Sequence, residues 1–240
     1  NGEMGIDRFV FIGDHRQLPA VVVQHTSQST VQSPALHDIG LLDCRQSLFE
    51  RLHRLAPEQC DMLTHQGRMH AIISEFVCKN YYNGHLRPVP LPHQTEPLGW
   101  KEYTPQNERQ NYIATHRMGQ RHVEPDTEEA NNKVNEREAE EVARMVGELY
   151  HLAVLNNKAW EPALGVGIIV PFRGQIAMIR QWLQRLDIPD WQQITIDTVE
   201  RYQGSQRDVI LFSTVVRQRY QMDILSAPSE SDGVPVDRRL

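Results

Sequence analysis

Two short polar stretches contain side chains that suit a transferred phosphate. In GDHRQLP (residues 13–19) a neutral amide, Gln17, follows Asp14 by three residues and stands just beyond an apolar run. In HQGRMH (residues 65–70) the planar guanidinium of Arg68 lies between histidines. A phosphoryl-transfer site surrounds the terminal phosphate with donors and positions a water molecule. The amide of Gln17 could donate to that phosphate or that water, and a guanidinium suits the charge that builds on the transferring oxygens.

Each of these residues also has a purely structural interpretation. Gln17 could be a turn residue that caps backbone groups, and Arg68 could form an ordinary surface salt bridge. A third stretch, VPFRGQ (residues 170–175), carries Arg173 and Gln175 at a predicted strand-to-helix turn. Backbone N–H groups at such a turn could meet a phosphate, but helix capping explains these residues equally well.

The elements around these stretches predict an α/β domain. Short apolar runs bounded by glycine or polar residues predict strands, and apolar residues at helical spacing predict helices. The predicted elements are strands at Phe9–Ile12, Val166–Val170, Ile194–Thr198 and Val209–Val215, and a helix at Arg173–Leu186. This order is typical of a mostly parallel sheet flanked by helices, in which ligands bind beyond the carboxyl ends of the strands. That edge is expected to hold Gly13–Gln17, Pro171–Gln175 and Thr198–Gly204.

Three further helices and two irregular stretches complete the expected organisation. Helices are predicted at Asp43–Leu55, at Ala71–Tyr82 with a stop at the following Asn-Gly pair, and from near Asn135 onward. The acidic start of the last helix suits the positive end of the helix dipole, and its glutamates are expected to form a solvated face. Gln24–Leu36 is expected to be a loop, and the proline-rich stretch 87–126 an irregular excursion.

Composition is that of an ordinary globular protein. Of the 240 residues, 40% are hydrophobic and 23% are charged, and the net charge is −6. No apolar run approaches the length needed to cross a bilayer. Arginine supplies most of the 25 basic residues and suits bidentate phosphate contacts, so the charge permits nucleic-acid binding without showing it. The three cysteines fit no zinc spacing, which favours reduced, partly buried thiols in a cytoplasmic protein, with no metal site.

Four stretches in chain order resemble motifs of superfamily 1 helicases. They are GDHRQLP, HQGRMH, VPFRGQ and DTVERYQGSQRDVI (residues 197–210), and FVCKNYYNGHL (residues 76–86) ends the helix after the second. They are similar to the GDxxQLP, QYRMH, TPYxxQ and DTxxxFQGxExD patterns of the branch that includes the nonsense-mediated-decay helicase and the replication helicase-nucleases. The resemblance leaves the proline-rich stretch unmatched. It implies a RecA-like P-loop NTPase fold, with 1–60 as the tail of a first RecA-like domain and linker and 61–240 as the second domain.

The resemblance also implies roles for individual residues. Gln17 and Arg68 would act in ATP hydrolysis, Gln17 by coupling phosphate sensing to domain closure and Arg68 by reaching the γ-phosphate. The implied nucleotide contacts are Gly13, Asp14, Gln17, Gln66, Gly67, Arg68 and Gln206. The implied nucleic-acid contacts are Arg173, Gln175, Thr198, Gln203 and Gly204. Hydroxyl, amide and backbone groups of this kind position a single strand of DNA or RNA without reading its sequence.

Two departures from the family pattern bear on nucleotide recognition. Gly67 stands where the family has the tyrosine that stacks on adenine, and Gln206 stands where it has the glutamate that contacts the ribose. Both changes weaken base and sugar recognition and leave phosphate contacts possible, so the protein could choose nucleotides with little base preference or could have lost efficient turnover. Tyr202 replaces a phenylalanine and is expected to pack in the core.

Other parts of an ATP site are missing from the sequence. There is no G-x-x-x-x-G-K-[ST] loop, and no Asp-Glu pair before Gly13 to hold Mg²⁺. With Asn1 rather than methionine in first place, these absences favour a piece of a longer polypeptide whose first RecA-like domain completes the site for ATP and Mg²⁺. The expected function is therefore that of a C-terminal motor fragment, inactive by itself, of an ATP-dependent DNA or RNA helicase or translocase. The alternatives are a helicase-derived clamp without efficient ATP turnover, and another P-loop enzyme, such as a kinase, with accidental matches.

Overall fold

The computed structural model describes residues 8–18, 24–96, 133–216, 218–226, 228–231 and 234–237. The chain divides into two compact units, one formed by Asn1–Leu63 with Ala227–Leu240 and the other by Thr64–Ser226. These units are defined by packing, whereas the expected domains 1–60 and 61–240 are defined by motifs. The division into domains therefore stays a prediction.

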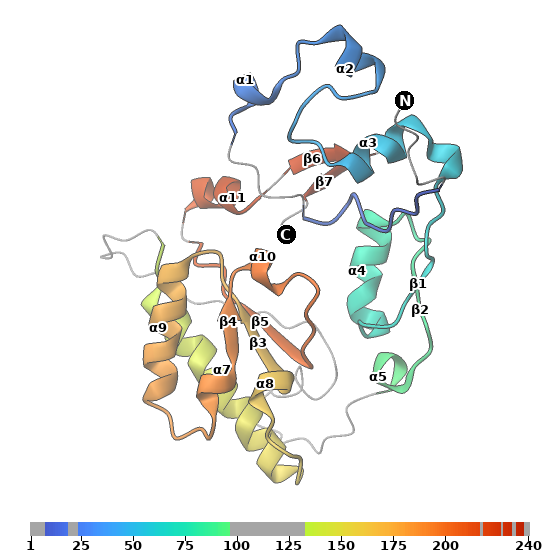
Figure 1. Cartoon of the computed structure of the whole chain (residues 1–240). Helices are drawn as coiled ribbons and strands as arrows, with labels where there is room; N and C mark the ends of the chain where they lie inside the picture. Colours follow the sequence, from blue (N-terminus) through green and yellow to red (C-terminus); the bar gives the residue numbers. More distant parts are fainter. Residues whose placement is uncertain are drawn as a thin grey trace. The chain divides into compact units, whose positions relative to one another are not determined.

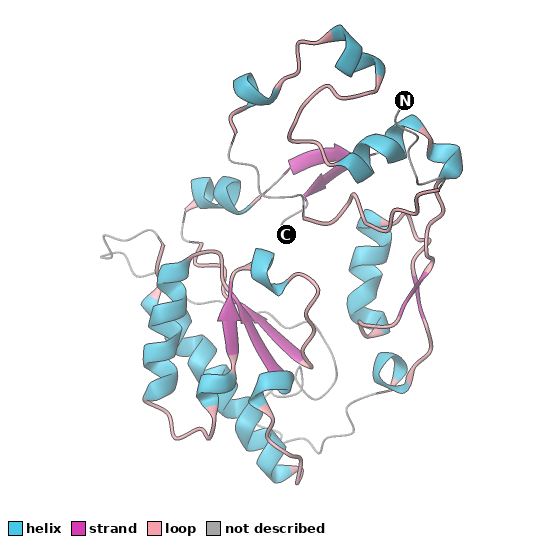
Figure 2. Ribbon diagram, in the orientation of Figure 1, coloured by secondary structure: helices cyan, strands magenta, loops and turns pink. Residues whose placement is uncertain are grey.

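A three-stranded parallel sheet lies within the second unit (Figures 1 and 2). Its strand order is β4-β3-β5, with β3 at Val166–Ile169, β4 at Thr195–Asp197 and β5 at Val209–Phe212. Ile168 in the central strand is in register with Ile196 on one side and Leu211 on the other. Each strand falls within a predicted one, and the parallel pairing confirms the α/β fold expected from the sequence.

Two helices pack against one another and against this sheet (Figure 1). They are α7, at Glu136–Leu155, and α9, at Arg173–Gln184. Val146 of α7, Ile179 and Leu183 of α9 and Ile168 of β3 belong to one hydrophobic cluster and are almost completely buried. The apolar stripes predicted from helical spacing therefore form the core.

Helix α7 begins close to where the sequence predicts, because Asn135 caps it. The side-chain oxygen of Asn135 accepts a hydrogen bond from the backbone N–H of Glu138 at 3.1 Å. This bond satisfies one of the donors that a helix leaves free in its first turn.

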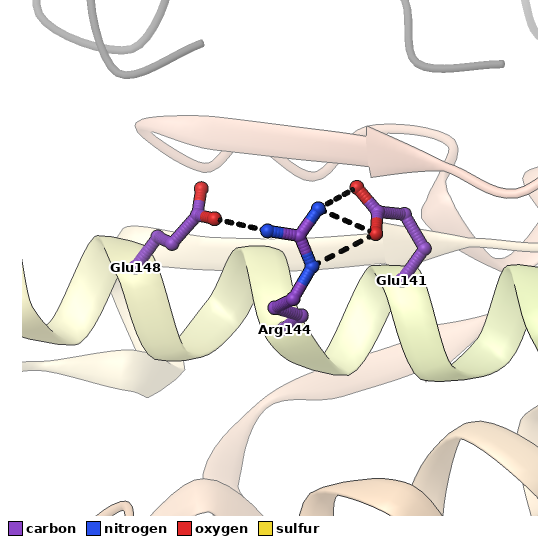
Figure 3. Close-up of polar contacts among 3 residues, drawn as sticks. All are labelled: Glu141, Arg144 and Glu148. Carbon is purple, nitrogen blue, oxygen red and sulfur yellow. Dashed lines mark hydrogen bonds and ion pairs between the residues drawn. The ribbon is translucent and has the colours of Figure 1, made fainter. Parts of the chain in front are cut away.

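Some glutamates of α7 differ from the expected solvated face. Arg144 lies between two of them, with Nη2 at 2.6 Å from Glu141 Oε1 and Nη1 at 2.8 Å from Glu148 Oε1 (Figure 3). The glutamate side chains are only 19% and 13% exposed, respectively. A third glutamate, Glu138, accepts the backbone N–H of Val215. The expectation was therefore wrong for Glu138 and Glu141, whereas Glu136 and Glu140 are exposed as expected. Residues three and four apart meet on one helix face, so the arginine can bind Glu141 and Glu148 together.

A smaller group of elements forms residues 64–96. Strands β1 (His65–Gln66) and β2 (Arg87–Pro88) pair in parallel, and helices α4 (Ala71–Tyr81) and α5 (Pro92–Thr95) follow them in turn. Helix α4 ends where predicted, since Asn83 and Gly84 have φ angles of 50° and 77°. The start of the proline-rich stretch is ordered into β2 and α5, contrary to the expected irregular excursion, and 97–126 lies outside the described residues. Short elements complete the second unit at α8 (Pro162–Gly165), η2 (Trp191–Gln193), α10 (Val199–Tyr202) and α11 (Arg219–Leu225).

The first unit contains short elements. They are α1 (Thr26–Ser29), α2 (Pro34–Asp38), α3 (Leu48–Leu55), η1 (Pro57–Gln59) and the antiparallel pair β6 (Pro228–Ser231) and β7 (Val234–Asp237). Helix α3 confirms the second half of the helix predicted there, and the side chain of Ser47 caps it by accepting from the N–H of Glu50. The stretch 24–36 was expected to be a loop but includes α1 and the start of α2.

The predicted strand Phe9–Ile12 is not formed. These residues have no regular secondary structure, and Val10 and Ile12 are 87% and 92% exposed. A strand needs a neighbour for its backbone groups and a cover for its apolar side chains. No strand in the described ranges pairs with these residues, which is why the apolar run alone misled the prediction.

Cys44, Cys60 and Cys78 are free thiols, and the first two are exposed rather than partly buried as expected. Among the described residues, no cluster of three or more histidine, cysteine or acidic side chains could hold a metal ion. None of the described helices combines the length and apolar character that crossing a membrane requires.

Candidate functional site

Arg68 lies in a short loop between β1 and α4 whose backbone is held by the side chain of Gln66. The Oε1 atom of Gln66 accepts from the N–H groups of Arg68 and Met69 at 2.9 and 2.7 Å, and its Nε2 donates to the Met69 carbonyl at 2.9 Å. The Arg68 guanidinium is exposed and forms no ion pair or hydrogen bond with any residue that the structure describes. The loop therefore presents an available guanidinium from a fixed backbone.

Helix α5 supports the same loop from outside. His93 Nε2 lies 2.9 Å from the Gly67 carbonyl. Gln94, which is completely buried, donates from Nε2 to the carbonyls of Gln66 at 2.9 Å and Met69 at 3.0 Å. Neither residue stands out in the sequence, because their partners are 25 to 28 positions earlier in the chain and no local pattern links them.

Gly67 is not required by the shape of this loop. A Cβ atom added there would meet only Leu91 Cδ1, at an ordinary contact distance of 3.7 Å, and the φ angle is outside the left-handed region. The backbone conformation therefore does not require glycine at this position, and the change from the family tyrosine removes an aromatic ring without a structural need.

The carboxyl ends of β3 and β4 place two further candidate residues at one edge of the sheet. Ile169 and Asp197 end these strands and are in register. Arg173 begins α9 after β3, and its exposed side chain has no partner among the described residues. The hydroxyl of Thr198, which follows β4 directly, likewise has no described partner. Both residues lie at the edge where the sequence places them.

Gln175 has a different environment from its neighbours on this edge. Its side chain is completely buried, accepts from the Asn135 N–H at 2.8 Å, and donates to the Asn135 carbonyl at 3.0 Å and to Ser213 Oγ at 3.2 Å. The amide thus joins the start of α7 to α9 and to the residue after β5. This geometry gives Gln175 a structural role, and its contact with nucleic acid stays a prediction.

A strained residue lies next to this network. Val215 has a φ angle of 59° and is completely buried. Its N–H lies 3.1 Å from each carboxylate oxygen of Glu138. A β-branched residue at positive φ is a genuine outlier, and backbone strain of this kind clusters at functional sites.

The segment after β4 exposes the other candidate contacts. Gln203, Gly204 and Gln206 are exposed. Gly204 has a φ angle of 82°, and a Cβ atom there would meet nothing within 4 Å. The backbone conformation, and not space, is therefore what favours glycine at this position.

Tyr202 anchors this segment to the sheet. It is buried, as the sequence predicts. Its hydroxyl accepts from the Ile168 N–H at 3.1 Å and donates to the Thr195 carbonyl, so it bridges β3 and β4. Burial raises the pKa of this hydroxyl above the ordinary tyrosine value.

In the GDHRQ turn of the first unit, the glutamine side chain forms a hydrogen bond within the turn. The Asp14 carboxylate accepts from the Arg16 N–H at 3.0 Å and from Gln17 Nε2 at 2.9 Å. A Cβ at Gly13 would lie 3.0 Å from a ring carbon of Phe49, so this position has little room for a side chain. The turn fits the structural interpretation of Gln17, and its action on a phosphate stays a prediction.

The candidate nucleotide residues fit phosphate better than base or sugar. Arg68 offers charged donors in a planar fork, the geometry that matches phosphate oxygens. Gly67 offers no ring for stacking, and Gln206 offers an amide where the family has a carboxylate. No carboxylate cluster for Mg²⁺ is present in the described ranges.

Comparison with known proteins gives consistent matches. The AAA domain family matches residues 44–230. The chain is 29% identical over 230 residues to the DNA replication ATP-dependent helicase/nuclease DNA2 of Xenopus laevis, which covers 87% of this chain and 19% of that protein. It is 29% identical over 235 residues to the regulator of nonsense transcripts 1 of Dictyostelium discoideum, which covers 91% and 15%. It is 26% identical over 217 residues to the ATP-dependent helicase NAM7 of Saccharomyces cerevisiae, which covers 88% and 20%. The chain thus spans at most a fifth of the length of these relatives.

Proposed function

Because this chain belongs to the AAA domain family, and within it to the superfamily 1 helicases of the nonsense-mediated-decay and replication branch, we propose that it is the C-terminal motor part of an ATP-dependent helicase or translocase. The observation that carries the proposal is the environment of Arg68. An arginine that stabilises a transferring phosphoryl group needs a fixed backbone and a guanidinium not engaged elsewhere. The Arg68 loop provides both within the described structure.

In the proposed mechanism the residues of this chain have three roles: stabilising charge on the phosphate, orienting water or sensing the phosphate, and holding the strand. Bound ATP with Mg²⁺ supplies the phosphoryl group and the free energy for movement. Arg68 stabilises charge on the transferring oxygens, and Gln17 orients the attacking water or senses the phosphate. Arg173, Thr198 and Gly204 hold a single strand by its phosphate-sugar backbone. Since the sequence has no phosphate-binding loop, hydrolysis requires the first RecA-like domain, which would carry this loop and the Mg²⁺ ligands.

The relatives favour nucleic acid as the substrate without choosing between DNA and RNA. One is named for DNA replication and another for nonsense transcripts. Backbone contacts of the proposed type serve DNA and RNA alike.

Replacing Arg68 tests this function. In the intact protein, Arg68→Ala is expected to lower kcat for ATP hydrolysis in the presence of a single strand by about a thousandfold, the lower range for loss of an arginine finger. Arg144→Ala is the matched control, since that guanidinium is already bound by Glu141 and Glu148, and it should leave hydrolysis unchanged. The 240-residue chain alone should hydrolyse no ATP. Unchanged hydrolysis by Arg68→Ala would overturn the proposal.

Gly67 and Gln206 favour a second candidate, a clamp that holds nucleic acid without efficient turnover. This candidate predicts an intact protein that binds single strands but hydrolyses ATP near the background rate. The motor predicts hydrolysis that single strands stimulate. Steady-state turnover of the intact protein with and without a strand therefore distinguishes the two.

Nucleotide choice follows from Gly67 if the motor is active. Stacking on an aromatic ring contributes roughly 1–3 kcal/mol per base, and glycine contributes none. The intact protein is expected to use ATP and GTP with similar kcat/KM, and Gly67→Tyr to shift the ratio toward ATP by about tenfold to a hundredfold. A Cβ atom at this position makes only an ordinary contact, so the backbone tolerates a side chain there. A wild-type preference for ATP above about a hundredfold would show that other residues bind adenine.

A further inference from the structure

The backbone polar groups of the Arg68 loop are held from two sides. From inside, Gln66 binds the N–H groups of Arg68 and Met69 and the Met69 carbonyl. From outside, α5 binds the carbonyls of Gln66, Gly67 and Met69. The loop is therefore closed by two glutamine amides, one within the motif and one from a helix that no motif includes.

Gln94 is the stronger of the two contacts from α5. Its Nε2 donates to the carbonyls at both ends of the loop, Gln66 and Met69. Because both partners are carbonyl oxygens, which only accept, the amide must face them with its NH₂ group. Its side chain is completely buried, so water cannot easily replace these bonds. His93, by contrast, is exposed and reaches a single carbonyl.

We propose that Gln94 is a positioning residue for Arg68: its buried amide ties the two ends of the loop and so fixes the direction in which the guanidinium points. The proposal rests on the proposed function of Arg68 as the phosphate contact. Without the Gln94 amide, the Gln66 carbonyl keeps the Val89 N–H as a donor and the Met69 carbonyl keeps Nε2 of Gln66. The buried group that links the two ends of the loop is lost, so the loop can rearrange. An error of about 1 Å in a catalytic group can cost about a hundredfold in rate.

A double-mutant cycle tests the proposal in the intact protein. Gln94→Glu keeps the shape of the side chain but replaces the two donors with acceptors. It is expected to lower kcat for strand-stimulated ATP hydrolysis by about tenfold to a hundredfold with a smaller change in KM. In the Arg68→Ala background the same change should lower kcat by less than about twofold, because a residue that acts through Arg68 has nothing left to position.

Two controls separate positioning from general stability. Thr95→Ala removes a hydrogen bond to Leu91 that stays within α5 and its cap, and it should leave kcat unchanged. Gln94→Ala removes the donors without adding charge. It should lower kcat in the wild-type background and change it little in the Arg68→Ala background, as Gln94→Glu does. Strand binding without nucleotide should be the same in all variants.

The outcomes distinguish this proposal from the function on which it rests. If Arg68→Ala has no effect on hydrolysis, the proposed function fails. If Arg68→Ala lowers kcat but Gln94→Glu leaves it unchanged, or lowers it equally in both backgrounds, only the positioning role fails. Failure of both Gln94 variants to fold would also overturn the proposal, since it would make Gln94 a residue of general stability.

Discussion

Tyr202 places a hydroxyl between two strands where phenylalanine would leave two backbone groups to find other partners. We expect Tyr202→Phe to lower the free energy of unfolding by about 1–3 kcal/mol, the cost of leaving a buried donor or acceptor unsatisfied. The groups concerned are the Ile168 N–H and the Thr195 carbonyl. Tyr150→Phe is the control, because the Tyr150 hydroxyl has no hydrogen bond within the described ranges. Equal urea midpoints for the two variants would contradict the bridging role.

The same hydroxyl predicts a pH dependence. Burial raises the pKa of Tyr202 above the ordinary 10.0, so the folded state favours the neutral phenol. Its stabilising contribution is complete below pH 10.0 and is lost as the pH rises through the folded pKa, because the unfolded tyrosine ionises first. The difference in unfolding free energy between wild type and Tyr202→Phe should therefore shrink above pH 10.0. A difference that stays constant or grows in alkaline solution would contradict the buried, neutral hydroxyl.

At the scale of elements, periodicity predicted those whose apolar residues meet a neighbour. The core helices α7 and α9 and the strands β3, β4 and β5 lie within or close to their predicted ranges. The run Phe9–Ile12 is equally apolar but forms no strand, because a strand is a property of a pair of segments and not of one. Apolar periodicity indicates which residues favour burial. Only the folded chain shows whether a neighbouring element covers them.

The sequence motifs single out candidate residues but do not predict their contacts. Arg68 and Arg173 could be singled out because they stand in stretches that resemble helicase motifs and because a guanidinium suits phosphate. The burial of Gln175 could not, since an amide suits a helix cap and a strand contact alike and its partner Asn135 is 40 positions away. Gln94 could not be predicted for the same reason, because its hydrogen-bond partners are carbonyls of a distant loop.

Two arginines on neighbouring helices, Arg173 and Arg144, are expected to differ in their contribution to strand binding. Arg173 at the start of α9 has no described partner, whereas Arg144 on α7 is bound by two glutamates (Figure 3). Arg173→Ala should weaken single-strand binding equally for all sequences and reduce the salt dependence by about one phosphate contact. Arg144→Ala should change neither quantity. Fluorescence titration at several salt concentrations measures both, and equal losses from the two variants would exclude a specific role for Arg173.

For the whole molecule, charge sets how tightly the chain can hold a strand. The net charge is −6, so general electrostatic attraction to phosphate is absent and binding must come from local contacts. The candidate groups at the sheet edge are mostly uncharged, as with Thr198, Gln203 and Gly204. The strand should therefore be held by a few hydrogen bonds to its backbone and few ionic contacts.

The 240-residue chain alone is accordingly expected to bind single strands weakly and without sequence preference. One or two ionic contacts, at about 0.7 counterions released per phosphate contact, give a slope of about −1 for log K against log salt. Poly-dT and poly-rU should bind with similar affinity, because backbone contacts read neither base. A strong preference for one sequence would show base contacts that these residues do not provide. A slope near zero would remove Arg173 from the binding surface, while a much steeper slope would require a basic surface formed by other residues.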